Sequence, residues 1–362
     1  MQNTERGYMK GFVTIDTLYL HMKYPKGDIF DMYHQQVEGV DTRILRNGIV
    51  YGDFVIKGGG SGYKVSVWQH DARVFLTDQV DEKCGEDQGM GIWIQLGPKF
   101  LIQNMHDLKS EIIYFLIDLG ITDFYPISIS RLDLAIDCLG LAMVNQNENF
   151  WKNGWVGRSQ LSKVIYNSRT SNLESIYIGS RKSPIYLRIY DKVAQSIADG
   201  DYLYWLDIWK DFKGPVTRIE WEVKPKKGNF PEGLTNFDKF NDEAVRELLV
   251  YLLDWGKLCN PDPVDSNRSR WEENQLWCEI KGLAETWLNG VHWPTSRFGK
   301  EFHGVNEKYI KFLSGTLSGG MAKMNPKEPN LIGLLHALDD AGESPDKIQR
   351  KAKMKAELVK RL

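Results

Sequence analysis

Acidic, arginine and tyrosine residues alternate with apolar residues in three short segments: SISRLDLAIDC (128–138), PIYLRIYDK (184–192) and VTRIEWEVK (216–224). Successive side chains of a β-strand point to opposite faces, so this spacing predicts three strands with one charged and one apolar face. The charged faces carry Arg131, Asp133, Asp137, Arg188, Tyr190, Arg218, Glu220 and Glu222. If the strands are neighbours in a sheet, these groups crowd one surface, as a metal-assisted phosphoryl-transfer site requires.

Each residue type on this surface has a part to play in phosphoryl transfer. Hard divalent cations such as Mg²⁺ prefer oxygen ligands, and the suitable donors here are Asp133, Asp137, Glu220 and Glu222. The arginines can brace the carboxylates or bind phosphate through two hydrogen bonds. The hydroxyl of Tyr190 can form a covalent phosphotyrosine, and a metal ion or Lys192 would help it lose its proton.

A plainer interpretation is a solvated sheet face on which arginines pair with carboxylates across strands. For any one strand this interpretation is the better one. The repetition of R-x-[DE] or R-x-Y in three strands favours a functional surface. Buried acids repel one another unless a cation lies between them, which also favours a functional site if all four acids converge.

These same segments carry a family resemblance. The ordered motifs SRLDLAID, YIGSRKSPIYLRIYDK (177–192) and TRIEWEVK resemble the core signature of the Rep_trans family. This family contains rolling-circle replication initiators of plasmids and filamentous phages, together with related relaxases of conjugative elements. Weaker similarity at IDTLYL, GIWIQLGPKFL and DSNRSRWEENQLW extends the resemblance over most of residues 10–280.

The resemblance implies a reaction and the residues that perform it. Tyr190 would attack one origin strand and stay on the 5′ phosphate, and the freed 3′ hydroxyl would prime synthesis. Lys192 would act beside Tyr190, and the implied metal ligands are Asp133 and Glu220, with Asp137 or Glu222 completing the shell. Apart from the resemblance, the charged-face arginines Arg131, Arg188 and Arg218 are the expected phosphate-binding residues, and Arg181 and Lys182, in the turn just before the tyrosine strand, are expected to contact DNA. Acids would replace the histidine pair of ordinary HUH nickases, and the seven histidines of this chain form no H-x-H motif.

The composition narrows the cellular setting. The chain has 362 residues, 42% of them hydrophobic and 26% charged, and its pI near 6.4 gives no overall basic signature of nucleic-acid binding. No apolar run is long enough to span a membrane, and the first twenty residues lack the zones of a signal peptide. Four widely spaced cysteines form no CxxC pair. We therefore expect a cytoplasmic protein with reduced thiols and no membrane contact.

The order of expected elements predicts an α+β fold, and the resemblance implies an HUH-nickase-like antiparallel sheet with flanking helices. We expect an opening strand at 10–20, a helix near 28–38, hairpins from 48 to 105, and a helix at 106–119 that ends at Gly120. Further strands are expected near 163–167 and 174–179, and a helix near 202–212. A segment rich in Lys, Gly and Pro at 225–240 indicates a boundary. The expected domains are a catalytic nicking domain, 1–230, and a helical accessory or DNA-recognition domain, 231–362.

The predicted function is rolling-circle replication initiation by site-specific, metal-dependent DNA nicking and rejoining through a 5′-phosphotyrosine. The cofactor would be Mg²⁺ or Mn²⁺. The partners would be origin DNA in single-stranded or cruciform form, with a host helicase and a second copy of the chain as further candidates. Two alternatives stay open: a conjugative relaxase that acts at a transfer origin, and a non-catalytic origin-binding regulator of the same fold.

Overall fold

The computed structural model describes residues 9–23, 28–77, 91–121, 126–143, 148–228, 230–290 and 292–295. The chain divides into two compact units. The first comprises residues 1–106 and 120–295, and the second comprises residues 107–119 and 296–362. In the second unit the described element is helix α4 (Leu108–Asp118). Gly120 follows it with a left-handed φ of 87°, as predicted from the sequence.

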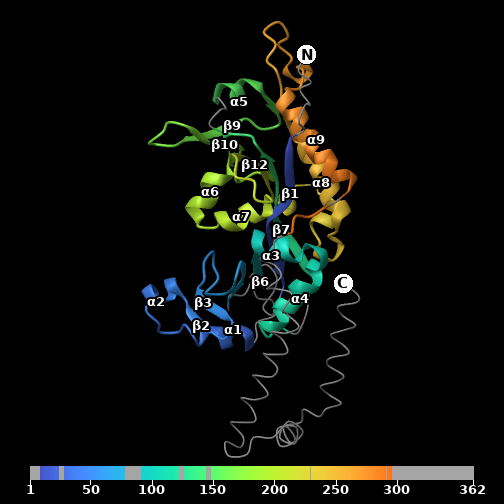
Figure 1. Ribbon diagram of the computed structural model, residues 1–362. Helices are drawn as coiled ribbons and strands as arrows, with labels where there is room; N and C mark the ends of the chain where they lie inside the picture. The colour runs from blue at the N-terminus through green and yellow to red at the C-terminus, as the bar shows by residue number, and fades with distance from the viewer. Residues whose placement is uncertain are drawn as a thin grey trace, which may run out of the picture. The chain divides into compact units, whose positions relative to one another are not determined.

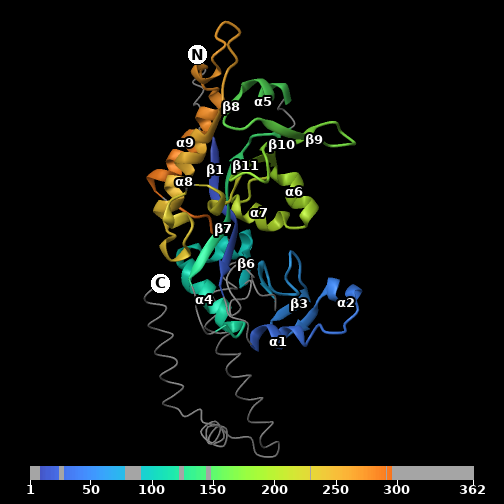
Figure 2. The same ribbon diagram turned by 180° about the vertical axis from the view of Figure 1, so that it is seen from behind.

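An antiparallel sheet of eleven strands forms the centre of the first unit (Figures 1 and 2). Its order is β2-β3-β4-β5-β6-β1-β7-β12-β11-β10-β9, so β1 and β7 lie in the middle. The strands are β1 (Lys10–Met22), β2 (Ile49–Tyr51), β3 (Phe54–Gly58), β4 (Val65–Gln69), β5 (Ala72–Leu76), β6 (Ile92–Leu96), β7 (Ile127–Leu139), β9 (Leu161–Tyr166), β10 (Leu173–Gly179), β11 (Ile185–Asp191) and β12 (Val216–Val223). A second, two-stranded sheet pairs β8 (Trp155–Gly157) with β13 (Gly256–Leu258). The α+β class and the antiparallel sheet predicted from the sequence are confirmed.

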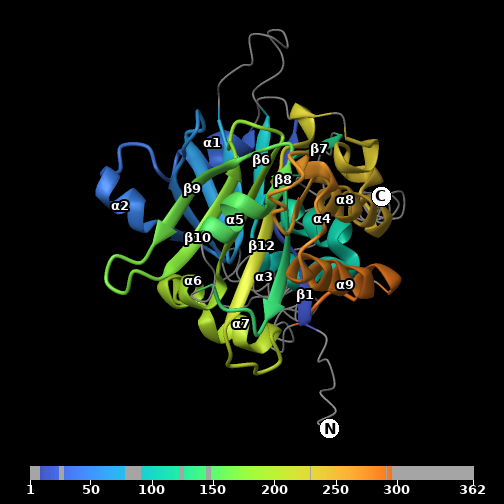
Figure 3. The same cartoon turned by 90° about the horizontal axis from the view of Figure 1, so that it is seen from above.

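Helices cover parts of both faces of the large sheet. They are α1 (Asp28–His34), α2 (Thr42–Asn47), α3 (Pro98–Asn104), α5 (Glu148–Gly154), α6 (Lys192–Asp199), α7 (Tyr202–Ile208), α8 (Asp242–Trp255) and α9 (Gln275–Asn289). Short 3₁₀ turns occupy Met105–Asp107, Pro225–Lys227, Glu232–Leu234, Phe237–Lys239 and Arg268–Arg270. Helices α6 and α7 lie on one face of the sheet, and α8 and α9 lie on the other (Figures 1 and 3).

The alternation of side chains in β7 separates two environments. Leu132, Leu134 and Ile136 are fully buried on the face that carries the main core. The opposite face carries Asp133 and Asp137, and we call it the polar face. Strand β12 shows the same alternation, yet all eight of its residues are buried, including its charged ones. Charged groups on this face are therefore desolvated and need partners within the protein.

A small apolar cluster holds α7 on the polar face. Its buried members are Ile102, Tyr204, Trp205, Ile208, Trp209 and Val216. The aromatic segment expected at 202–212 thus serves chiefly as core, and its helix ends earlier, at Ile208. Helix α6 was not expected from the sequence. Its start is fixed by Asp191, whose carboxylate accepts a hydrogen bond from the Ala194 amide at 2.9 Å, and Gly200 ends it with a left-handed φ.

The predicted C-terminal domain lies mostly outside the described residues, which end at 295. Its first two helices, α8 and α9, belong to the same compact unit as the sheet. Asn241 caps α8 by accepting a hydrogen bond from the Ala244 amide at 2.9 Å. The separate helical domain at 231–362 stays a prediction. Within the described ranges, no helix combines the length and apolar composition that crossing a membrane requires.

Candidate active site

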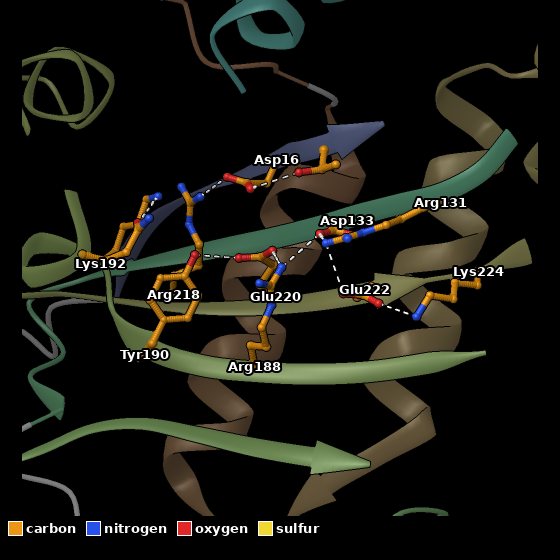
Figure 4. A network of polar contacts seen from close by, with 12 residues as sticks. Asp16, Arg131, Asp133, Arg188, Tyr190, Lys192, Arg218, Glu220, Glu222 and Lys224 are labelled. Atoms are coloured by element: carbon orange, nitrogen blue, oxygen red, sulfur yellow. Dashed lines mark hydrogen bonds and ion pairs between the residues drawn. The ribbon is translucent and has the colours of Figure 1, made fainter. Parts of the chain in front are cut away.

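The three charged strands are neighbours, in the order β7-β12-β11. Glu222 of β12 pairs with Asp133 of β7, and Glu220 of β12 pairs with Arg188 of β11. Tyr190 lies directly opposite Arg218. The charged faces of the three strands therefore form one surface, on which the side chains make two clusters of hydrogen bonds and ion pairs (Figure 4).

Tyr190 lies at one end of a chain of charged contacts. Its hydroxyl donates a hydrogen bond to Glu220 Oε2 at 2.6 Å. The other oxygen of Glu220 is paired with Arg188, and Arg188 Nη2 also donates to Asp133 Oδ2 at 3.0 Å. Glu220 and Asp133 are 1% and 0% exposed, so one guanidinium bridges two buried carboxylates.

A second arginine extends the network along the same face. Arg131 donates to Asp133 through Nε at 2.7 Å and through Nη2 at 2.5 Å. The same Nη2 lies 3.1 Å from Glu222 Oε2, and Glu222 is also paired with Lys224 at 2.5 Å. Glu222 is therefore held by two cations, whereas the Tyr190 hydroxyl is bonded to Glu220.

A third arginine organises the other end of the surface. Arg218 is fully buried and donates to Asp137 through Nε at 2.6 Å and Nη2 at 2.8 Å. Asp137 accepts a further hydrogen bond from the indole of Trp209 at 2.9 Å. The remaining nitrogen of Arg218 is paired with Asp16 of β1. Asp137 thus belongs to a separate cluster from Asp133, four residues and about 13 Å away along the strand.

Asp16 was not predicted as a site residue, although the sequence carries a signal for it. The pairing of β1 with β7 shifts between Ile15 and Thr17, so Asp16 is the extra residue of a β-bulge. Bulges redirect a side chain next to functional sites. The buried apolar positions of β1 are 13 and 15 before the bulge and 18, 20 and 22 after it. This change from odd to even positions reveals the bulge in the sequence itself.

Lys192 lies beside Tyr190 but does not contact its hydroxyl. Its ammonium donates to Gln195 Oε1 at 2.6 Å and lies 4.2 Å from the ring centroid of Trp205 and 6.0 Å from that of Tyr190. Trp205 also covers Arg218, whose Cζ is 4.1 Å from the ring centroid. One tryptophan of α7 therefore shields two cations of the site from solvent.

The two basic residues in the turn before β11, both predicted to contact DNA, are exposed to solvent. Arg181 and Lys182 are exposed, and the Arg181 guanidinium lies 5.9 Å from the ring centroid of Tyr186. The carbonyl of Arg181 accepts a hydrogen bond from Lys224. The turn is thereby tied to the end of β12.

The buried setting shifts the acid–base behaviour of the site. Burial raises the pKa of Tyr190 well above its ordinary value, and the Glu220 carboxylate adds to the rise. Burial also raises the pKa of Asp133 to about 7 against the opposing effect of Arg131. Burial and the Arg218 charge lower the pKa of Lys192. The tyrosine is thus a neutral phenol that needs a proton acceptor before it can act as a nucleophile.

The predicted metal ligands do not converge on one point. Asp133 and Glu220 are brought together, but Arg188 lies between them, and Asp137 is held by Arg218. Over the described ranges, no three His, Cys, Asp or Glu residues are arranged to hold a metal ion. As arranged, the carboxylates are matched to guanidinium groups and do not fit a metal ion.

No model of a known protein family matches the chain, and no curated protein sequence matches it. Among solved structures, the chain is similar to a rolling circle replication initiator protein from Geobacillus stearothermophilus. The two share 16% sequence identity and superpose with a TM-score of 0.45, over 76% of this chain and 97% of the other. A similarity of this extent assigns no function by itself, so the function is argued from the site.

Fold and site together define an α+β protein in which one face of a large antiparallel sheet carries a tyrosine hydrogen-bonded to a buried carboxylate, with three arginines that each pair with buried carboxylates. Sequence reasoning identified ten site residues, and seven of them take part in these contacts: Arg131, Asp133, Asp137, Arg188, Tyr190, Arg218 and Glu220.

Proposed function

We propose that the protein cuts and rejoins one strand of DNA through a covalent 5′-phosphotyrosine at Tyr190, and that it initiates rolling-circle replication in this way. The observation that carries the proposal is the 2.6 Å hydrogen bond from the Tyr190 hydroxyl to Glu220, on a face lined by arginines. The order of the three motifs resembles the Rep_trans family and points to the same reaction.

The contacts support a transesterification with Glu220 as general base. The Tyr190 oxygen attacks the phosphorus of a phosphodiester while its proton passes to Glu220 Oε2. A bond forms between this oxygen and phosphorus, and the bond from phosphorus to the 3′ oxygen breaks. The 3′ oxygen leaves as a hydroxyl after taking up a proton. Because one phosphodiester replaces another, the reverse attack by the 3′ hydroxyl rejoins the strand.

We propose that Arg188 holds the phosphate during this step. Its Nε is buried and has no hydrogen-bond partner among the described residues, although Nη2 serves both Glu220 and Asp133. A guanidinium with an unused donor binds phosphate readily, because its fork of N–H groups matches two phosphate oxygens. Arg131, Arg181 and Lys182 extend positive charge away from this point for contacts with neighbouring phosphates.

The test is transfer of a label from DNA to the protein. A pool of 3′-labelled single strands of randomised sequence is incubated with the full chain, and covalent adducts are separated in denaturant. The cut leaves the 3′ portion on Tyr190, so the label must follow the protein. We expect adducts with the wild type and none with Tyr190→Phe. Equal labelling of both proteins, or none with either on this pool and on DNA from the neighbourhood of the gene, would contradict the proposal.

Glu220→Gln tests the role of the base. The amide keeps a hydrogen-bond acceptor for Tyr190 but cannot take up its proton, so we expect the adduct to form about 10²–10⁴-fold more slowly. Glu222→Gln is the matched control, because Glu222 lies two residues away on the same face and pairs with Arg131 and Lys224 instead. If Glu222→Gln slows adduct formation more than Glu220→Gln does, Glu220 is not the general base.

The need for Mg²⁺ or Mn²⁺ stays a separate prediction. The same assay with each cation, and with a chelator, measures it directly. If Glu220 is a ligand of the required cation, Glu220→Ala should abolish the stimulation of adduct formation by that cation. Unchanged stimulation would show that Glu220 is not a cation ligand. A replication origin, a transfer origin, a host helicase and a homodimer are likewise predictions, and the neighbouring genes separate the first two most cheaply.

A further inference from the structure

The polar face continues beyond the candidate site, across strands β1, β6, β5 and β4. Arg131 of β7 pairs with Tyr19 of β1, and Tyr19 pairs with Gln95 of β6. Gln95 pairs in turn with Arg73 of β5, so all four residues lie on the polar face. Arg73 in turn pairs with Trp68 of β4. The face that holds Tyr190 therefore runs without a break to the far strands of the sheet.

Aromatic side chains line this extension, on the side away from the core. We call Tyr19, Trp68, Phe75 and Trp93 the aromatic row. Trp93 is its centre, with its ring centroid 5.0 Å from that of Phe75 and 5.4 Å from that of Tyr19. Each of the four is half-buried. Cross-strand aromatic pairs stabilise a sheet, but here they occupy its solvated face, where their rings can also meet a ligand.

Cations accompany the aromatic row at both ends. The Lys57 ammonium and the Arg73 guanidinium each lie 4.0 Å from the ring centroid of Trp68. Arg131 lies 5.0 Å from the ring centroid of Tyr19, at the edge of the candidate site. Strands β3, β4, β5 and β6 contain no acidic residue. Lys57 and Arg73 therefore give these four strands a positive charge; Asp71, in the turn between β4 and β5, is an acid that acts on Arg73.

The opposite flank of the site repeats the arrangement. Tyr177 and Tyr186 are stacked, with centroids 5.8 Å apart and planes inclined by 18°. Lys163 lies 6.0 Å from the ring centroid of Tyr177, and Arg181 lies 5.9 Å from that of Tyr186. Tyr177 pairs directly with Arg188 of the site. Rings and cations thus flank the candidate site on both sides.

We propose that the aromatic row, with Lys57 and Arg73, is a binding path for single-stranded DNA that leads to Tyr190. Unpaired bases stack on aromatic side chains and on guanidinium planes, while lysine and arginine neutralise the phosphates. Six strand intervals separate Trp68 from Tyr190, about 29 Å at the usual spacing, so the path accommodates several nucleotides. The inference rests on the proposed function only for the chemistry at Tyr190.

The experiment measures equilibrium binding in the full-length Tyr190→Phe protein, in which no covalent adduct can accumulate. The probes are fluorescent single strands long enough to cross the sheet, one of mixed sequence and one of equal length without bases. We expect the strand without bases to bind more weakly, because it keeps the phosphates but cannot stack. Trp68→Leu and Tyr177→Leu should each weaken binding of the mixed strand by about 5- to 100-fold and leave the abasic strand unaffected.

Tyr251→Leu is the matched control, because Tyr251 is an exposed aromatic residue of α8, on the other face of the sheet. Its variant should bind both strands as the parent does. Equal affinity of the parent for the two strands, or a folded Trp68→Leu protein that binds like Tyr251→Leu, would overturn the proposal. Tighter binding of an RNA strand or a duplex of the same sequence would overturn the assignment to single-stranded DNA. Binding and adduct formation are measured separately, so this inference and the proposed function can fail independently.

Discussion

At the scale of single residues, the site is a balance of buried charges. Five acids, Asp16, Asp133, Asp137, Glu220 and Glu222, face five bases, Arg131, Arg188, Lys192, Arg218 and Lys224. Burying an unpaired charge is costly, and removing one partner of a buried pair leaves the other uncompensated. The consequence is that stability and function are coupled at these positions, so each variant needs a folding measurement beside its activity.

Asp16→Asn tests this balance away from the proposed nucleophile. The nearby Arg218, Lys192 and Arg188 charges lower the pKa of Asp16 even though burial acts to raise it. A carboxyl with a lowered pKa stabilises the fold above its unfolded pKa, near 3.9, and this contribution is lost as pH falls through the folded pKa. We expect Asp16→Asn to reduce the free energy of unfolding by about 1–3 kcal/mol at neutral pH. This difference from the wild type should shrink as pH falls and the Asp16 carboxylate of the wild type becomes protonated.

Urea unfolding at a series of pH values measures this difference. Asp254→Asn is the control, because Asp254 is 74% exposed and forms a long 3.8 Å pair with Lys281. Exposed pairs contribute about 0–1 kcal/mol, so that variant should stay near the wild type throughout. A loss in Asp16→Asn that persists unchanged into strong acid would show that the carboxylate charge is not its cause.

At the scale of elements, the β-bulge in β1 positions Asp16 so that its carboxylate pairs with Arg218. Ile15 pairs with Leu134 and Thr17 with Asp133, so pairing resumes directly after the extra residue. A second register shift, between Tyr19 and Leu20, skips Ser130 of β7 and leaves the alternation of β1 itself unchanged. Removing Asp16 therefore restores an uninterrupted alternation and shifts neither half of β1. This is unusual, because changing a strand by one residue ordinarily turns its side chains to the opposite face.

This geometry predicts the effect of deleting Asp16. We expect the protein without Asp16 to keep its fold and to lose stability to about the same extent as Asp16→Asn. Deletion of Leu18 is the control, since it forces the polar Thr17 into the position of a fully buried leucine. Circular dichroism and urea unfolding compare the three proteins. If the two deletions are equally harmful, β1 does not tolerate the loss of the bulge residue, and the expectation for Asp16 is wrong.

Element types were largely predictable because their signals are local. The alternation of β7, β11 and β12, the Asn241 cap of α8 and the glycine after α4 all depend on residues close in sequence. The adjacency of β7, β12 and β11 could only be assumed, because it is set by long-range pairing. Helix α6 was missed since its cap, Asp191, was interpreted as the end of a strand motif.

The partners of the site residues were harder to predict than their identities. Period-two alternation places Asp133 and Asp137 on one face, but it does not say which arginine each will meet. The role of Trp205 and Trp209 as covers over Arg218 and Asp137 depends on the fold of α7 onto the polar face. Such contacts come from tertiary packing, which no local pattern encodes.

At the scale of the sheet-containing unit, long-range pairing dominates. Central strands β1 and β7 are joined through pairs such as Thr17 with Asp133, more than a hundred residues apart. Cys138 lies in the middle of this arrangement, paired with Gly11 on one side and Thr217 on the other. Burial raises the pKa of its thiol, and the thiol is fully inaccessible. Its chemical reactivity therefore reports opening of the central sheet.

Alkylation followed by mass spectrometry tests this expectation. Cys278, exposed on α9, should react at once in the native protein. Cys138 should stay protected, and its modification in urea should follow the same transition as the tryptophan fluorescence. Rapid labelling of Cys138 without denaturant would show that the central strands open locally, well below the free energy of global unfolding.

The register of β1 has one further consequence. Strand β6 pairs only with the part of β1 that follows the bulge, from Leu18 to Met22, through five residue pairs. The meander β2–β6 is thus joined to the rest of the sheet along a short seam, while β7 pairs with nearly the whole of β1. A nucleic-acid strand bound along the aromatic row would cross this seam. It would then hold β6 and β1 together through contacts additional to their five residue pairs.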